Sequence, residues 1–130
     1  MPCTYRIDVD RHLSCVSGTG IVTFKDVADC ERALAVDPCF DPAFPLLLDL
    51  RGVENVDLTA AQMQSLAAAS PVGRWTRRAI VADRPSVFGV ARMYEIVREN
   101  RMGTDVVRVC RTLEEARGWL GVDQPKQSLG

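Results

Sequence analysis

The sequence is poor in the residues that catalytic and metal-binding sites usually require. It has a single histidine, His12, and five scattered cysteines without a Cys-x-x-Cys pair. A structural zinc site needs clustered thiolates or imidazoles, so we expect no metal site. No stretch approaches the roughly 18 apolar residues of a membrane-spanning helix, and no charged-then-apolar leader opens the chain. We therefore expect a cytoplasmic protein without a transmembrane segment.

The chain also lacks a surplus of either charge. Its 16 basic and 17 acidic residues leave a formal net charge of -1. Because binding to phosphates needs a clear positive surplus, nucleic acid is not an expected partner. A glycine-rich phosphate loop is missing as well, since Gly18-Thr-Gly20 lacks the third glycine and the usual spacing. We expect no cofactor.

What remains is the composition of an ordinary globular protein of 130 residues, enough for one domain with one core. The segment from Arg77 to Gly121 alternates short apolar runs with stretches of helical spacing. Two adjacent βα units of this kind require a parallel sheet with helices packed over it. The buried positions predicted on the central strands are Leu47, Leu48, Ile80, Val81, Val107 and Val109.

The N-terminal segment has the alternation of a half-buried strand. Tyr5, Ile7 and Val9 alternate with charged residues, and Asp10-Arg11-His12 suits a three-residue hairpin loop. Such a loop would set Leu13, Cys15 and Ser17 opposite Val9, Ile7 and Tyr5 on one face. Cys15, Cys30 and Cys110 all fall at positions expected inside, where cysteine acts as a small apolar residue.

Polar capping residues mark where the helices begin. Three capping boxes are predicted, at Thr23 to Asp26, Thr59 to Gln62 and Thr112 to Glu115, and Ser86 after Pro85 is the expected cap of a further helix that runs to Asn100. The fold class is therefore α/β: a single domain over residues 1–121 with a mixed sheet, an antiparallel entry hairpin and then parallel βα units. Residues 122–130 are expected to form a flexible tail.

Three segments resemble one known family. The run Leu46-Leu-Leu-Asp-Leu-Arg-Gly-Val53 before a capped helix resembles the central strand of STAS domains, and Ala79-Ile-Val-Ala-Asp83 followed by Phe88-Gly-Val-Ala-Arg-Met-Tyr94 is similar to the next unit. The ending Val109 to Gly121 resembles the close of SpoIIAA-like proteins. The resemblance implies a SpoIIAA-like fold and a regulatory or binding module rather than an enzyme.

The resemblance also points to a switch-like helix entry. Members of the family place a phosphorylatable serine directly after an aspartate at the start of the helix that follows the central strand. Asp57 matches that aspartate, whereas Leu58 stands at the serine position and Thr59 follows. Thr59 could accept phosphate, but helix capping alone also explains its position.

A ligand site is the alternative functional reading. Ligands of open α/β sheets bind beyond the carboxyl ends of the strands. The polar residues expected at that edge, which could hold an anion, are Asp83, Arg84, Ser86, Arg111 and Thr112. Arg74-Trp-Thr-Arg-Arg78 is a second candidate, a short basic patch whose Trp75 could stack on a base, anchor at a lipid surface or simply pack on the domain.

The helix from Ser86 gives the main indication of a partner. Val87, Val90, Ala91, Tyr94 and Val97 form its core stripe, while Arg92 and Glu95 are expected to face water. Phe88, Met93 and Ile96 fall off that stripe. They either form a contact with a partner or lie beneath the 38–45 loop. In a homodimer, Arg92 and Glu95 would bracket this contact with charge.

The sequence thus favours a non-catalytic regulatory or protein-interaction module with a protein partner. The alternative is a small-ligand or lipid-surface binding protein that uses the cleft at the strand ends, and an enzyme ranks third. A deep apolar cavity between helices would favour the ligand alternative, and a filled core would favour protein interaction.

Overall fold

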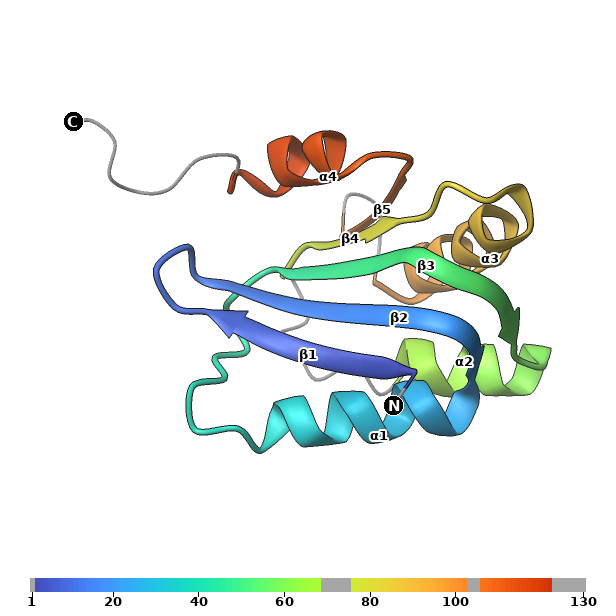
Figure 1. Ribbon diagram of the computed structural model, residues 1–130, viewed down its shortest axis with the longest axis horizontal. Coiled ribbons are helices and arrows are strands. Elements are labelled where there is room, and N and C mark those ends of the chain that lie inside the picture. The colour runs from blue at the N-terminus through green and yellow to red at the C-terminus, as the bar shows by residue number, and fades with distance from the viewer. Residues whose placement is uncertain (1, 69–75, 103–105, 123–130) are drawn as a thin grey trace.

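The computed structural model describes residues 2–68, 76–102 and 106–122. Within these ranges a five-stranded sheet is combined with helices in the predicted order (Figure 1). The elements are β1 (Cys3–Asp8), β2 (Leu13–Thr23), α1 (Phe24–Ala35), β3 (Leu46–Asp57), α2 (Ala60–Ala68), β4 (Arg78–Val81), α3 (Pro85–Met102), β5 (Val107–Cys110) and α4 (Leu113–Leu120). The predicted tail lies outside the described residues except for Val122, which is buried.

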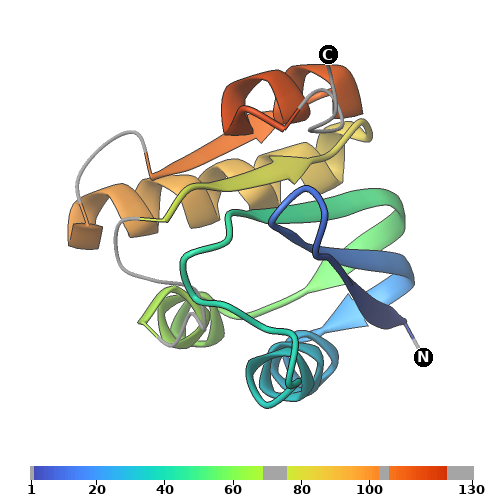
Figure 2. The ribbon, with the colours of Figure 1, turned by 90° about the vertical axis from the view of Figure 1, so that its left-hand side faces the viewer.

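The strands follow one another across the sheet in the order β1-β2-β3-β4-β5. β1 and β2 are antiparallel, and every later pair is parallel. Because βα crossovers are right-handed, a sheet that grows in one direction places its crossover helices on one face. α1, α2 and α3 accordingly contribute to one core cluster, while α4, which follows the last strand, packs on the other face (Figures 1 and 2). The predicted α/β class and mixed sheet are confirmed.

The register of the entry hairpin differs from the prediction. Tyr5 pairs with Val16 and Ile7 with Ser14, so the expected pairing with Ser17 and Cys15 is wrong. The reason is a four-residue connection over residues 9–12, closed by a bond from the His12 amide to the Val9 carbonyl, with His12 in the left-handed region at φ 54°. Val9 therefore belongs to the turn and is 51% exposed. A one-residue shift moves every side chain of a strand to the other face.

The helix starts agree with the capping residues in three cases of four. Thr23 and Asp26 form the reciprocal capping box of α1, and Thr112 caps α4 by accepting a hydrogen bond from the Glu115 amide. The Glu115 carboxylate accepts from the Arg111 amide instead of completing the box. Ser86 is not a cap: α3 begins at Pro85, and the Phe88 amide donates to the Arg84 carbonyl. Proline suits the first helical position because its missing N–H needs no partner there.

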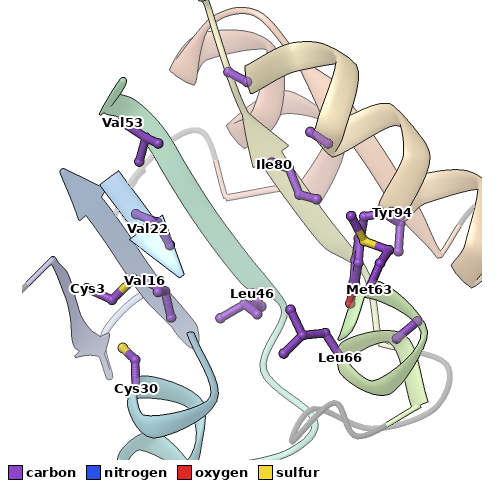
Figure 3. Packing of buried hydrophobic residues seen from close by; sticks show 14 of the residues in the cluster. Cys3, Val16, Val22, Cys30, Leu46, Val53, Met63, Leu66, Ile80 and Tyr94 are labelled. Atoms are coloured by element: carbon purple, nitrogen blue, oxygen red, sulfur yellow. The ribbon is translucent and has the colours of Figure 1, made fainter. Parts of the chain in front are cut away.

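Side chains of the central strands alternate between two core clusters. Leu46 and Ile80 point to the α1–α3 face, where Figure 3 shows them beside Met63 and Leu66 of α2 and Tyr94 of α3. Leu47 and Val81 point to the α4 face. Of the predicted core, Leu47, Ile80, Val81 and Val107 are buried, whereas Leu48 and Val109 are only partly buried against the first cluster.

Four of the five cysteines fill space in the core. Cys15, Cys30 and Cys110 are buried as predicted, Cys3 is buried as well, and Cys39 is exposed. Burial, with a smaller contribution from the neighbouring Cys30, raises the pKa of the Cys3 thiol to about 11. Burial likewise raises the pKa of Cys110 to about 11. Since the thiolate is the reactive form, these thiols stay protonated and inert at neutral pH.

We expect one thiol, Cys39, to react quickly with an aromatic disulfide reagent in the native protein at neutral pH. All five should react after unfolding in denaturant, because burial alone protects the other four. The absorbance of the released thiolate measures both numbers. Cys39→Ser is the matched control and should remove the fast phase. A fast phase that survives this substitution would contradict the burial of the remaining thiols.

Candidate functional site

The most unusual feature of the core is a cluster of polar side chains beneath α1 and α3. It consists of Glu31 on α1, Arg78 at the start of β4 and Tyr94 on α3, all of them buried. Arg78 lies two residues before Ile80 and therefore shares its inward face, since side chains alternate along a strand. Glu31 occupies the inward stripe of α1 between Val27 and Leu34, at helical spacing. We call these three residues the polar cluster.

The contacts within the polar cluster are direct. Arg78 Nη1 donates to the Tyr94 hydroxyl oxygen at 2.6 Å and lies 3.5 Å from Glu31 Oε2. Arg78 is 1% exposed. Burial raises the pKa of Glu31, and the lowering by Arg78 and Arg98 offsets this only in part. Burial also raises the pKa of Tyr94. The cluster thus holds ionisable groups away from water, which costs free energy. Each group is stabilised there by its contacts within the cluster.

Arg98 extends this buried polar region toward α2. Its Nη1 donates to the Ala67 carbonyl at 2.6 Å, and the side chain is 1% exposed. Ala67 lies in the last turn of α2, where carbonyl groups lack partners within the helix. A guanidinium is favourable at that end of a helix because of the helix dipole. Arg98 therefore ties α3 to α2 beside the polar cluster.

A cavity of about 60 Å³ adjoins the polar cluster. Its walls come from the sheet and from α1, α2 and α3, and they are apolar apart from Glu31, Arg78 and Tyr94. A groove of about 360 Å³ is also lined by Glu31 and Leu66, together with further residues of α1 and α2. Sequence reasoning missed this arrangement because charged residues are rarely buried, although the spacing of Arg78 from Ile80 was a usable signal.

The residues predicted at the carboxyl ends of the strands do gather at one edge. Asp83 and Arg84 lie exposed in the β4–α3 connection, and Ser86 lies exposed in the first turn of α3. Arg111 and Thr112 lie exposed where β5 leads into α4. The two connections are neighbours because β4 pairs with β5 up to Val81 and Cys110. The Arg111 guanidinium stacks over the Phe88 ring at 4.0 Å. Anion binding at this edge stays a prediction.

The switch-like entry of α2 is a complete capping box. The Gln62 amide donates to Thr59 Oγ1 at 3.1 Å, and the Thr59 amide donates to Gln62 Oε1 at 2.9 Å. The capping role of Thr59 is thereby confirmed. Asp57 ends β3 and, like Thr59, is exposed. A threonine hydroxyl already engaged in capping has a structural role that requires no modification.

The outer face of α3 carries the exposed apolar pair that the sequence indicated. Met93 is 54% exposed and Ile96 is 46% exposed, so the alternative that they lie beneath the 38–45 loop is wrong. Phe88 differs from them, because it packs against the first core cluster. The expectation for Glu95 is also wrong: it is buried, and its carboxylate accepts a hydrogen bond from the exposed Arg92.

The basic patch predicted from Arg74 to Arg78 does not form a continuous surface. Arg74 and Trp75 lie outside the described residues, and Arg78 is buried in the polar cluster. Arg77 is exposed and turns to α4, where its Nη1 donates to the Trp119 carbonyl at 2.7 Å. Its guanidinium lies 4.9 Å from the centre of the Trp119 ring, a cation–π contact that stabilises the packing of α4.

Neither a metal centre nor a membrane span is evident in the described ranges. In residues 2–68, 76–102 and 106–122, no three His, Cys, Asp or Glu side chains lie close enough together to hold a metal ion. Among the helices in the same part of the chain, none combines the length and the apolar character needed to cross a bilayer.

Comparison with known proteins gives a fold but no sequence family. No protein-family model matches the chain, and no curated protein matches it. An anti-sigma factor antagonist from Mycobacterium paratuberculosis aligns with a TM-score of 0.58 and 22% identity over 94% of this chain and 95% of that one. A protein of the DUF3478 family with a SpoIIAA-like fold from Shewanella loihica aligns with a TM-score of 0.58 and 17% identity over 91% and 93%. These full-length likenesses confirm the predicted SpoIIAA-like fold.

Proposed function

We propose that this protein is a non-catalytic regulatory module that binds another protein through the outer face of α3. The likeness to an anti-sigma factor antagonist over nearly the full length of both chains supports a regulatory role. The observation that carries the proposal is the exposed apolar pair Met93 and Ile96, one helical turn apart beside Arg92. Apolar side chains at i and i+3 share one helix face, and a charged rim around apolar anchors is the usual anatomy of a protein contact.

Affinity capture from the source organism tests this function. Ile96→Asp would place a carboxylate in the contact and should remove the captured partner. Ile21→Asp is the matched control, because Ile21 is 60% exposed on β2, and it should leave capture unchanged. A partner retained equally by wild type and Ile96→Asp would place the contact elsewhere, and recovery of no partner at all would contradict the proposed role.

A second copy of this chain is the first partner we propose. Two α3 faces related by a two-fold axis would bury Met93 and Ile96 in an isologous contact, the commonest form of closure for small soluble proteins. We expect wild type to be a dimer by light scattering at micromolar concentration, Ile96→Asp to be a monomer and Ile21→Asp to remain a dimer. A monomeric wild type would end the homodimer proposal, and a dimer that persists in Ile96→Asp would move its interface.

We further propose that Thr59 is a structural cap rather than a phosphorylation switch. Thr59→Ala should lower the free energy of unfolding by about 1 kcal/mol, because the Gln62 amide loses its acceptor. Thr59→Ser keeps the hydroxyl and should differ from wild type by less than about 0.5 kcal/mol. Urea unfolding measures both. Intact-mass analysis of protein from its native host should show no phosphate, and a stoichiometric phosphate on Thr59 would overturn this assignment.

A further inference from the structure

We propose that the cavity between the sheet and helices α1, α2 and α3 binds a small organic acid, with its carboxylate at Arg78 and Tyr94 and its apolar body among the surrounding aliphatic side chains. This site lies inside the domain, whereas the proposed protein contact lies on the outer face of α3. The two inferences are therefore independent, and either can fail without the other.

The lining of the cavity is that of a site for an amphipathic molecule. Ligand pockets are mostly apolar and carry a few convergent polar groups that fix orientation. Here the polar cluster supplies those groups, and the remaining walls include Val22, Val56 and Met63. A volume of about 60 Å³ exceeds the roughly 10–15 Å³ that a single water requires. The cavity on its own therefore has room for the carboxylate and only a few carbon atoms of a ligand.

The polar cluster favours an acid over a neutral molecule. A guanidinium presents several donors in one plane that match the two oxygens of a carboxylate. Tyr94 accepts the hydrogen bond from Arg78 through a lone pair of its hydroxyl oxygen, and a hydroxyl has one O–H of its own to donate to a ligand oxygen. Charge supports the same choice, because the two buried guanidinium groups of Arg78 and Arg98 outnumber the single carboxylate of Glu31.

The groove between α1 and α2 gives this cavity a route to the surface. Glu31 and Leu66 line both spaces, so the two spaces adjoin at these side chains. Leu66 is 8% exposed, and a change of its rotamer would join the cavity to the larger groove. Side-chain rearrangement of this size is common on binding and needs no movement of the backbone. Bodies longer than the cavity could then extend toward Ser65 and Ala28, which line the groove.

Hexanoate and hexan-1-ol are the probes that test this site, because they share a carbon chain and differ in the head group. We expect saturable hexanoate-induced shifts in the amide NMR spectrum of the full chain, centred on Leu66, Ala91 and Tyr94. Hexan-1-ol should bind at least about tenfold more weakly, the equivalent of about 1.4 kcal/mol. Equal affinity for the two probes, or no saturable shift with hexanoate, would overturn the proposal.

Two variants distinguish the cavity from other surfaces. Ala91 lines the cavity and is 4% exposed, so Ala91→Leu should fill it and abolish hexanoate binding. Ala33→Leu, on the exposed side of α1, is the matched control and should bind as wild type does. Tyr94→Phe, which removes a single oxygen, should weaken hexanoate and leave hexan-1-ol unchanged, and it keeps the test decisive if Ala91→Leu does not fold. Undiminished hexanoate binding in the folded variants would refute the site.

Discussion

Arg78→Met is expected to lower the free energy of unfolding by about 3–5 kcal/mol, which is the usual cost of removing one partner of a buried ion pair. Arg78 is 1% exposed and contacts both Glu31 and Tyr94. Methionine keeps much of the side-chain volume, so the loss measures the charge and its hydrogen bonds rather than a cavity. Urea unfolding at neutral pH gives the value, and a loss below about 1 kcal/mol would contradict the role assigned to Arg78.

The loss of unfolding free energy caused by Arg78→Met should become smaller as the pH falls. Burial already raises the pKa of Glu31 above its ordinary 4.5, and loss of the neighbouring cation would raise it further. Between the pKa of Glu31 in the unfolded state and its higher pKa in the folded state, the folded protein binds more protons than the unfolded chain. The free energy of unfolding therefore falls as the pH rises through this window. Glu31→Gln combined with Arg78→Met removes this titration. At neutral pH the double variant should therefore be closer to wild type in its free energy of unfolding than Arg78→Met alone.

Ile80→Ala should cost about 2–5 kcal/mol, the range for truncating a fully buried aliphatic side chain. Ile80 is 1% exposed on β4, where it packs in the first core cluster between the sheet and α1–α3. Ile21→Ala is the matched control, since Ile21 is 60% exposed, and it should change stability by no more than about 0.5 kcal/mol. Similar urea midpoints for Ile80→Ala and wild type would contradict the assignment of the central strands.

The order of elements could be predicted because local signals agree with the fold along most of the chain. Thr23, Thr59 and Thr112 mark helix starts, and the run from Leu46 has the apolar density of a strand covered on both faces. The hairpin register could not be predicted with the same rules. Val9 continues the alternation of β1 yet belongs to the turn, and pattern alone does not distinguish a three-residue from a four-residue connection.

The polar cluster was harder to predict than the core around it. Glu31 and Arg78 occupy inward positions of α1 and β4. A charged side chain at such a position usually indicates that the buried face ends there, because charged residues are rarely buried. Glu31 and Arg78 are 47 residues apart in the sequence, and only the packing of α1 over β4 brings them into contact. Glu95 lies off the core stripe of α3 and is nevertheless buried, and the spacing of that stripe does not contain its hydrogen bond from Arg92.

The exposed apolar pair of α3 could be predicted from the sequence, whereas the internal cavity could not. Exposed apolar residues off a helix stripe, such as Met93 and Ile96, can be recognised from spacing alone. An interior hollow such as the cavity beside Tyr94 depends on how side chains from separate elements meet, which spacing does not contain. The sequence could therefore indicate the exposed apolar pair of α3 but not the internal cavity.

Photo-crosslinking from α3 in cells tests the central claim, a protein contact at Met93 and Ile96, most directly. A photoreactive phenylalanine analogue at position 93 should give one defined adduct of this chain with a protein, and mass spectrometry would identify that protein as a second copy or a different one. The same analogue at position 21 of β2, which is also exposed, should give no such adduct. Adducts of equal yield from both positions, or none from position 93, would contradict the account.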